Sequence, residues 1–267
     1  MSPVVRGMLK HSLPSRLIVS LTSYPPRFST LELTLKCLLS QTMRPDAVIL
    51  WLAEGDQVTL PRSILAMKQL GLEIRTCPDY RSYKKIIPAL TGFPDAYIAT
   101  ADDDIYYRPN WLRELVEAHH TGEPEVVCHR AHLIVLDERG LPLPYDDWHL
   151  STQETGPSSL LFPTSGAGAL YPPGTFDSQV VDADMFLSLA PTADDLWLFW
   201  MAARNGATFR RVKRARRLSV WPGSQEVSLW LQNSDALNGN DRQIAHLLSA
   251  FGFPLGGTHK EHMGRAI

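Results

Sequence analysis

The sequence has few cysteines, no long apolar run and almost no net charge. Its three cysteines, Cys37, Cys77 and Cys128, are widely spaced and odd in number, which excludes a disulfide framework and the paired spacing of a zinc site. We therefore expect buried thiols in a reducing compartment. The formal net charge of −2 argues against nucleic acid as a partner, because such proteins present a basic surface.

Long apolar segments are also missing. No window reaches about 18 consecutive apolar residues, so no membrane-spanning helix is expected. The N-terminal stretch MSPVVRGMLKHSLPSRLIVSL has neither the apolar core nor the small-residue cleavage site of a signal peptide. The expected location is cytoplasmic, including the inner face of the membrane.

What the sequence does contain is typical of a globular protein. Of its 267 residues, 44% are hydrophobic and 20% are charged, which is enough apolar material for a sizeable core. It has no internal repeat, low-complexity segment or linker, so a single domain over residues 1–267 is expected.

The first half alternates apolar runs with helical patterns. We expect strands over 16–21, 47–52, 72–77 and 96–101, and helices over 29–41, 62–70, 81–90 and 110–120. Ser29 and Glu32 have the spacing of a capping box at the start of the first helix. Strands separated by helices of this length predict an α/β fold with a mixed, mostly parallel sheet and helices on both faces.

The second half changes character. Its residue pattern predicts strands around a Gly-containing turn over 126–145 and an apolar run broken by a small-residue loop over 158–173. It further predicts a deeply buried helix over 192–206, a basic strand over 207–220 and a terminal helix over 241–253.

Three acidic residues, Asp102, Asp103 and Asp104, directly follow the apolar run AYIATA. Because like charges repel, either the triplet is solvated or a positive group lies between the carboxylates. In an extended backbone Asp102 and Asp104 share one side and Asp103 the other. Two such carboxylates at the carboxyl end of a strand suit Mg²⁺ or Mn²⁺, whose shell is completed by water and phosphate. The alternative is an acidic turn before the helix that begins near Pro109.

An Asp-x-Asp element after the fourth strand resembles the nucleotide-sugar-dependent glycosyltransferases of the GT-A fold. The opening IVSLTSYPPRF…LLSQTMRPDAVILWL is similar to their first βαβ unit. The stretches TSGAGALYPP, TADDLWLFWMAARNGA and FGFP follow in the order of the bacterial capsule and polysaccharide type. They are also similar to the exostosin-like catalytic domain. The resemblance covers most of residues 16–255 and implies a nucleotide-binding half, 16–108, and an acceptor-binding and catalytic half, 109–267.

The resemblance implies roles for individual residues. The nucleotide pocket would be lined by Thr22, Ser23, Tyr24 and Arg27, with Tyr24 stacking on the base. The residues reaching the donor would be Arg81, Lys84 and Lys85, and the alternative for these cations is a solvated surface. Asp102 or Asp103 would hold the ribose or the donor sugar. Asp104, together with Asp102, would hold the metal.

Two further motifs are candidate site elements. Gly166 and Gly168 allow the backbone to approach a ligand closely, unless they only form a turn. Asp194 and Asp195 start the buried helix and are either caps or catalytic groups. Asp195, the first choice, would deprotonate the acceptor in an inverting reaction or stabilise positive charge at the sugar carbon in a retaining one.

The predicted function is therefore metal-assisted transfer of a sugar from a nucleoside diphosphate sugar, expected to be UDP-linked, to a saccharide or lipid-linked acceptor. Trp148, Trp197 and Trp221 would stack on acceptor rings or pack in the core. The run 210–217 holds six basic residues in eight positions. It suits contact with an anionic membrane surface, or else a charged edge strand protected from aggregation.

Two alternatives remain open on the sequence alone. The acidic cluster also suits a metal-dependent phosphohydrolase, although a haloacid-dehalogenase-type enzyme would need a nucleophilic Asp where the first strand ends in SLTSYPP. The other alternative is a non-catalytic module that binds a nucleotide or sugar.

Overall fold

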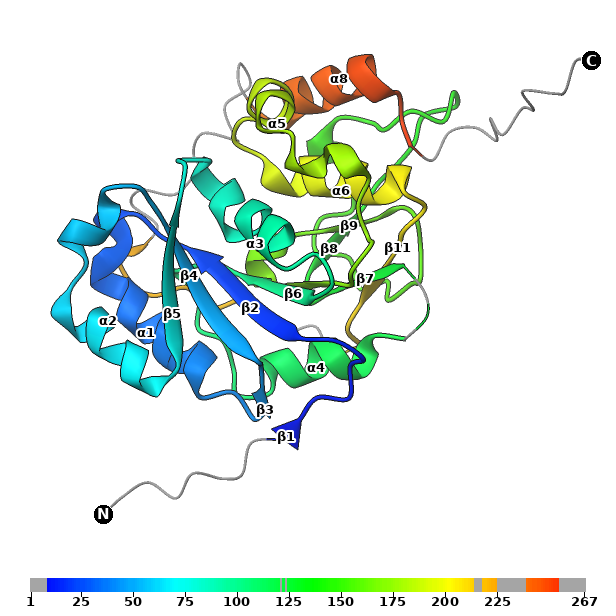
Figure 1. The fold of residues 1–267 in the computed structure, drawn as a ribbon. Coiled ribbons are helices and arrows are strands. Elements are labelled where there is room, and N and C mark those ends of the chain that lie inside the picture. Colours follow the sequence, from blue (N-terminus) through cyan, green and yellow to red (C-terminus); the bar gives the residue numbers. More distant parts are fainter. Residues whose placement is uncertain (1–8, 121, 123, 214–217, 225–238, 255–267) are drawn as a thin grey trace, which may run out of the picture.

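A seven-stranded sheet forms the centre of the protein (Figure 1). The computed structural model describes residues 9–120, 122, 124–213, 218–224 and 239–254. Along the sheet the strands lie in the order β11-β7-β10-β6-β2-β4-β5. They are β2 (Leu17–Thr22), β4 (Ala47–Ala53), β5 (Leu72–Cys77), β6 (Tyr97–Ala101), β7 (Glu125–Cys128), β10 (Ala169–Tyr171) and β11 (Thr208–Arg211). Strand β10 is antiparallel to both neighbours, and the other neighbouring pairs are parallel. The predicted α/β fold with a mixed, mostly parallel sheet is confirmed.

Helices cover both faces of this sheet because its strands are apolar on both sides. In β2, Leu17, Val19 and Leu21 belong to the core shared with α1 (Phe28–Leu39), α2 (Arg62–Ala66) and α4 (Trp111–Ala118). Ile18 faces the other core, which contains Ala89 of α3 (Ile87–Gly92). In Figure 1, α1, α2 and α4 accordingly lie on one side of the sheet and α3 on the other.

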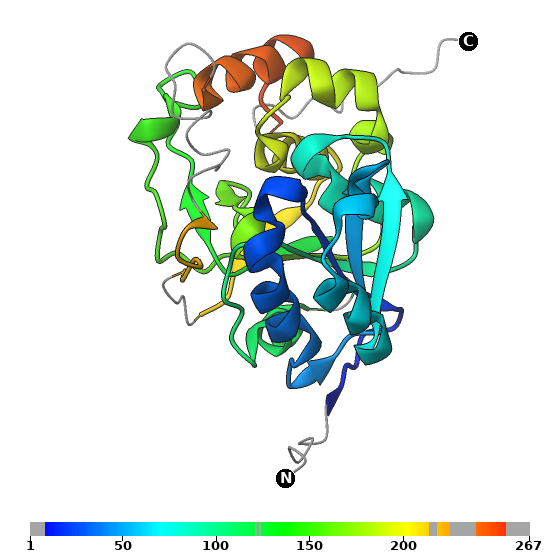
Figure 2. The ribbon, with the colours of Figure 1, turned by 90° about the vertical axis from the view of Figure 1, so that its left-hand side faces the viewer.

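The second face is completed by α6 (Asp194–Arg204). Its side chains from Leu196 to Ala203 are all buried, as the apolar pattern of residues 192–206 predicts. The helices α5 (Ala183–Leu189) and α8 (Asn240–Phe251) pack together beyond it, at the end of the molecule away from β1 (Figure 2).

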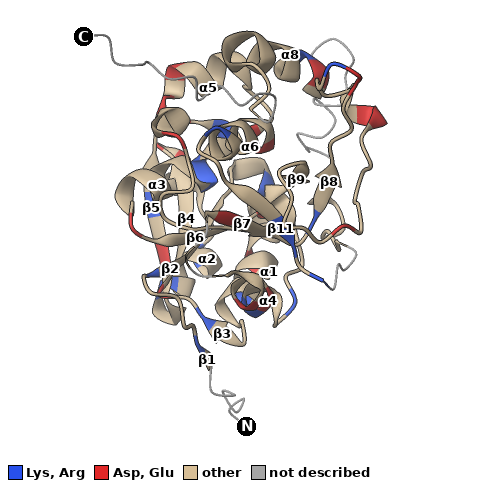
Figure 3. Ribbon diagram, turned by 90° about the vertical axis from the view of Figure 1, so that its right-hand side faces the viewer, with Lys and Arg blue, Asp and Glu red and all other residues tan. Residues whose placement is uncertain are grey.

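Smaller elements complete the described structure. They are the parallel pair β1 (Leu9–Lys10) and β3 (Met43–Arg44), and the antiparallel pair β8 (Ala131–Leu133) and β9 (Leu161–Pro163). The 3₁₀ turns are η1 (Pro25–Arg27), η2 (Asp56–Thr59), η3 (Met67–Leu70), η4 (Arg81–Lys85), η5 (Tyr145–Asp147), η6 (Ser165–Ala167) and η7 (Ser178–Val181). Lys, Arg, Asp and Glu are interspersed over the ribbon, in keeping with the small net charge (Figure 3). No described helix has both the length and the apolar character needed to cross a membrane.

Three local expectations are wrong. Helix α1 begins at Phe28, and no side-chain cap forms, because the preceding turn Pro25–Arg27 already leads into it; Ser29 therefore makes no capping box. The helix expected over 62–70 changes to a 3₁₀ turn after Ala66. The segment 81–90 is likewise a 3₁₀ turn followed by α3, since Pro88 has no N–H to donate within a helix.

Candidate functional site

The carboxyl ends of several parallel strands meet at one edge of the sheet. Strand β2 leads there to Ser23, β6 leads to the triplet 102–104, and β7 leads to Arg130. Since β10 runs the opposite way, the loop that precedes it, Ser165–Gly168, reaches the same edge. Ligands of α/β sheets bind at this edge, so we take it as the candidate site.

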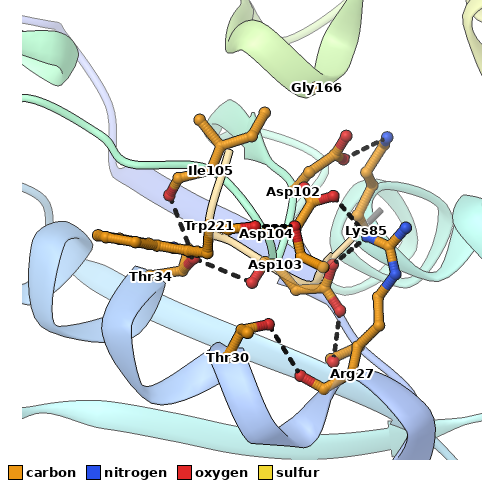
Figure 4. Close-up of polar contacts among 12 residues, drawn as sticks. Arg27, Thr30, Thr34, Lys85, Asp102, Asp103, Asp104, Ile105, Gly166 and Trp221 are labelled. Carbon is orange, nitrogen blue, oxygen red and sulfur yellow. Dashed lines mark hydrogen bonds and ion pairs between the residues drawn. The ribbon is translucent and has the colours of Figure 1, made fainter. Parts of the chain in front are cut away.

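The positive group among the three carboxylates is Arg27 (Figure 4). Its Nη1 lies 2.9 Å from Asp103 Oδ1 and 2.8 Å from Asp104 Oδ2. Asp103 also accepts from Ser23 Oγ at 2.5 Å. Burial raises the pKa of Asp103 to about 6, although Arg27 opposes this rise. Burial alone would lower the Arg27 pKa, but Asp103 and Asp104 raise it above its ordinary value.

The expected alternation of the triplet is wrong. Asp103 and Asp104 share Arg27, while Asp102 turns to Lys85, whose Nζ lies 2.9 Å from Asp102 Oδ1. The reason is that β6 ends at Ala101 and residues 103 and 104 form a turn. The solvated acidic turn is also wrong for Asp103 and Asp104, since both are buried.

Lys85 links the triplet to the start of α6. Its Nζ lies 3.0 Å from Asp194 Oδ2 as well as contacting Asp102. The ammonium group is buried. Burial opposes its charge, but the carboxylates of Asp102, Asp194 and Asp195 raise the Lys85 pKa well above its ordinary value. One buried cation therefore joins the two carboxylate groups that the sequence analysis treated separately.

The neighbouring basic residues behave differently. Lys84 is buried, but its partner is Asp79 and not a member of the triplet. Arg81 is exposed and donates to Pro191 O at 3.3 Å. The solvated alternative thus holds for Arg81 and is wrong for Lys84 and Lys85.

The loop after β2 combines inward hydroxyls with one aromatic ring. Thr22 Oγ1 donates to Trp51 O at 2.8 Å, and Ser23 contacts Asp103. The half-buried Tyr24 ring lies 5.9 Å from the Arg27 guanidinium carbon. Thr22 and Ser23 therefore fix the loop, and Tyr24 is the group of this loop that could stack on a base.

The two glycines are explained by close packing inside the protein. A Cβ on Gly166 would lie 2.2 Å from Asp102 Oδ2, and a Cβ on Gly168 would lie 2.2 Å from Trp111 Nε1. Gly168 also has a φ of 108°, which favours glycine. Gly166 thus makes room for a site carboxylate. Gly168 contacts Trp111, so its expected role in a ligand-binding wall is not supported by what it touches.

Neither Asp194 nor Asp195 is the N-cap of α6, which is Ala193 without a side-chain cap, but both lie in the first turn, where the helix dipole favours negative charge. Asp194 pairs with Lys85, and Asp195 Oδ1 accepts from Ser165 N at 2.9 Å. Burial and the adjacent Asp194 charge raise the pKa of Asp195 to about 6. A carboxylate that is ionised at neutral pH but readily protonated suits proton transfer.

Of the three tryptophans expected to stack on acceptor rings or to pack in the core, two lie in the core. Trp148 and Trp197 are buried, and their indole N–H groups donate to Leu143 O and Val180 O, so the core alternative is correct for both. Trp221 Nε1 donates to Thr34 Oγ1 at 2.8 Å.

In the basic run 210–217, Arg210 pairs with Glu125, and the buried Arg211 donates to backbone carbonyls. Lys213 is exposed, and residues 214–217 lie outside the described residues. The described part thus offers one exposed cation to a membrane, and membrane contact stays a prediction.

The corner is rich in carboxylates, which are the ligands that a hard divalent cation prefers. The carboxylates there are Asp102, Asp103, Asp104, Asp194 and Asp195, and in the described part of the chain two cations contact them, Arg27 and Lys85. The carboxylates therefore outnumber the cations that contact them, and an anionic ligand close to them would be repelled without another cation. Among the described residues no group of three or more His, Cys, Asp or Glu is arranged to hold a metal. Such a cation would have one or two carboxylate ligands, and its remaining ligands would come from the bound phosphate-containing substrate and from water.

Sequence reasoning missed several residues of the site. Tyr107 Oη accepts from Asp102 N at 2.7 Å and donates to Gly166 O at 2.6 Å, which ties the triplet to the small-residue loop. Ser165 orients Asp195, and Asp79 pairs with Lys84. Tyr107 and Ser165 lie beside predicted motifs, so closeness to those motifs was the available signal.

No protein-family model matches this chain, and no curated protein matches it either. Among solved structures, it is similar to TarS 1–349 from S. aureus, with 14% identity, a TM-score of 0.44, and coverage of 75% of this chain and 59% of that chain. It is also similar to 4-diphosphocytidyl-2C-methyl-D-erythritol synthase from Anaerococcus prevotii, with 13% identity, a TM-score of 0.42, and coverage of 69% and 81% respectively. Both TM-scores lie below 0.5, so we draw no conclusion about function from these two likenesses.

Proposed function

We propose that this protein is a glycosyltransferase of the GT-A type. It transfers a sugar from a nucleoside diphosphate sugar, expected to be UDP-linked, to a saccharide or lipid-linked acceptor. The observation that carries the proposal is the contact of one buried lysine, Lys85, with both Asp102 and Asp194. This contact brings the acidic triplet and the carboxylates of α6 to one corner, as transfer between a donor and an acceptor requires.

On the donor side, Tyr24 stacks on the nucleotide base and Lys85 neutralises the departing diphosphate. A fixed cation beside the leaving group stabilises the charge that develops there. Arg27 has a different task, since it holds Asp103 and Asp104 in place. Asp102, whose side chain is 35% exposed, is the member of the triplet best able to reach the donor sugar.

Asp104 and Asp102 would hold Mn²⁺ or Mg²⁺. When bound, this ion supplies positive charge to the diphosphate. The excess of carboxylates over the cations that contact them supports this part of the proposal, because the donor is itself an anion.

Asp195 acts on the acceptor side. Its contact with Ser165 N holds one carboxylate oxygen and so fixes the orientation of the side chain. In an inverting reaction the carboxylate takes the proton of the acceptor hydroxyl, whereas in a retaining reaction it stabilises positive charge at the sugar carbon. The anomeric configuration of the product, read by NMR, separates the two courses.

Two other functions are less well supported. A phosphohydrolase with an aspartate nucleophile after the first strand would need a carboxylate near Thr22 and Ser23, where the side chains are hydroxyls that donate inward. A module that only binds a nucleotide or sugar would not need a buried carboxylate with a raised pKa, such as Asp195, beside the triplet. A cytoplasmic location, with lipid-linked acceptors reached at the membrane face, belongs to the same proposal.

The test is hydrolysis of UDP-glucose, UDP-N-acetylglucosamine and UDP-galactose in the presence of Mn²⁺, followed by NMR of the released sugar. We expect turnover with at least one donor, and a loss of at least about 100-fold in Asp195→Asn with UDP affinity retained. Asp184→Asn is the matched control, because Asp184 is exposed on α5. Unchanged turnover in Asp195→Asn would contradict the assigned role, and release of UMP and sugar 1-phosphate in place of UDP and free sugar would favour a phosphohydrolase.

A further inference from the structure

Arg130 leaves the sheet on the far side of the small-residue loop from Asp102. Ala169 of β10 pairs with Thr100 of β6 on one side and with Cys128 of β7 on the other. Asp102 and Arg130 follow these two partners by two residues each. The strands β6 and β7 are separated by β10, so they lie about 10 Å apart. The backbone at Arg130 thus leaves the sheet about 10 Å from the backbone of the acidic triplet.

The arginine is held firmly in this position. Its Nε donates to Thr164 Oγ1 at 2.8 Å, and its carbonyl oxygen accepts from Thr164 N at 3.0 Å. Thr164 is buried, and the next residue, Ser165, donates its N–H to Asp195. Arg130 and the candidate catalytic carboxylate are therefore anchored to two consecutive residues of one loop.

Within the part of the chain that the structure describes, the positive charge of Arg130 has no acidic partner. Arg130 is half-buried, and among the residues that the structure describes no carboxylate lies within ion-pair distance of its guanidinium. This sets it apart from Arg27, Arg204 and Arg210, each of which has an acidic partner. A half-buried guanidinium without a counter-ion at the edge of a site is suited to bind a phosphate or carboxylate.

The surroundings of Arg130 suit a sugar. The half-buried Tyr145 ring packs against His132 and Trp148, with centroid distances of 5.7 Å and 4.8 Å. Burial and the nearby Asp195 charge raise the pKa of Tyr145, so its hydroxyl keeps its proton. A neutral phenol, an aromatic face and a cation are then available on the acceptor side.

We propose that Arg130 forms an acceptor subsite for a phosphate or carboxylate group carried by the sugar that receives the transferred residue. This inference rests on the proposed glycosyltransferase function. An anionic group at Arg130 orients the acceptor, and a hydroxyl on the same molecule reaches Asp195. The acceptor class is accordingly a phosphorylated saccharide or a uronic-acid-containing saccharide, and Arg130 determines specificity without taking part in the chemistry.

The test measures binding and not turnover. Saturation-transfer NMR compares glucose, glucose 6-phosphate and glucuronate on the protein with UDP and the diamagnetic ion Mg²⁺. We expect at least one of the two anionic sugars to bind about tenfold or more tightly than glucose, and the better of the two identifies phosphate or carboxylate as the recognised group. Equal binding of all three sugars by the wild-type protein would overturn the proposal.

Variants connect this preference to Arg130. Arg130→Gln is expected to remove the preference for the anionic sugar and to leave UDP affinity unchanged, while Arg130→Lys retains part of it. Arg139→Gln is the control, because Arg139 is exposed and pairs with Asp137. A preference that survives in Arg130→Gln contradicts the proposal. Weaker UDP binding in that variant assigns Arg130 to the donor and also contradicts it. Absence of UDP binding by the wild-type protein instead refutes the proposed function itself.

Discussion

At the scale of single residues, the site is defined by how its carboxylates are paired. Asp102 and Asp194 share Lys85, Asp103 and Asp104 share Arg27, and Asp195 takes a backbone N–H. Removing one partner of a buried pair leaves a charge uncompensated, which costs about 3–5 kcal/mol. The pairing therefore contributes to stability as well as to the proposed chemistry.

The raised pKa of Asp195 predicts a pH dependence. Burial and the Asp194 charge hold this pKa at about 6, and the proposed reaction needs the ionised form. We therefore expect kcat/KM for donor hydrolysis to fall about tenfold per pH unit below pH 6 and to level off above it. In Asp194→Asn one neighbouring negative charge is gone, so the pKa falls and the acidic limb moves to lower pH. A limb that stays in place or moves upward would show that another group controls it.

Gly166 provides a test of close packing at the site. A Cβ would lie 2.2 Å from Asp102 Oδ2, so Gly166→Ala must push the Asp102 side chain away from Lys85. We expect donor hydrolysis to fall at least about tenfold, with a loss of about 1–3 kcal/mol in the free energy of unfolding measured in urea. Gly92→Ala is the control, since a Cβ there meets nothing within 4 Å. Equal activity of the two variants would show that Asp102 need not hold its position.

At the scale of elements, the sequence predicted the strands well. The runs 16–21, 47–52, 72–77 and 96–101 are β2, β4, β5 and β6 with shifts of one residue at most at each end. The reason is that buried parallel strands are apolar on both faces, which is a local signal. Helix starts were less predictable: α1 follows a Pro-Pro turn without a cap, although Ser29 and Glu32 have the right spacing.

Contacts between elements could not be predicted in the same way. Arg27 and Asp103 are 76 residues apart in sequence, and their ion pair exists because β2 and β6 are neighbours in the sheet. The residue types at the corner were predicted from motifs, whereas their partners depend on strand order. Arg130 shows this most clearly, since its place beside the site depends on β10 lying between β6 and β7.

Helix α6 gives the prediction that belongs to this scale. Trp197 is fully buried in it and donates to Val180 O at 2.9 Å, so its role is packing and not acceptor stacking. Trp197→Phe keeps an aromatic ring but loses the hydrogen bond and some volume. We expect a loss of about 1–3 kcal/mol in the free energy of unfolding, with donor and acceptor KM unchanged well below the melting temperature. A changed acceptor KM at unaltered stability would contradict the core assignment.

At the scale of the whole molecule, two halves of the chain share one sheet and one site. Strands β2, β4, β5 and β6 come from residues 16–108, whereas β7, β10 and β11 extend the same sheet from the second half. The two halves of the chain meet where β10 inserts next to β6, and in the proposed function this is the junction of donor and acceptor. Binding of a donor at this junction should therefore stabilise the folded protein as a unit.

This leads to a prediction for ligand and metal together. The carboxylates at the corner outnumber the cations that contact them, so UDP alone should bind weakly and UDP with Mn²⁺ should bind well. A ligand at about 100 times its Kd stabilises the native state by about 2.7 kcal/mol. For a chain of this size that corresponds to a rise of roughly 5–10 °C in Tm.

The measurement is thermal unfolding with UDP, GDP or CMP, each with Mn²⁺ and each with EDTA. We expect the full rise with UDP and Mn²⁺, little rise with Mn²⁺ alone, and loss of the rise with EDTA. In Asp104→Asn the response to Mn²⁺ should be lost, while Asp184→Asn should respond as the wild type does. A rise with UDP that persists in EDTA would show that Arg27 and Lys85 suffice to neutralise the diphosphate. In that case protonation of Asp103 and Asp195, whose pKa values are raised to about 6 by burial, should help the donor to bind, and the stabilisation by UDP should weaken as the pH rises above 6.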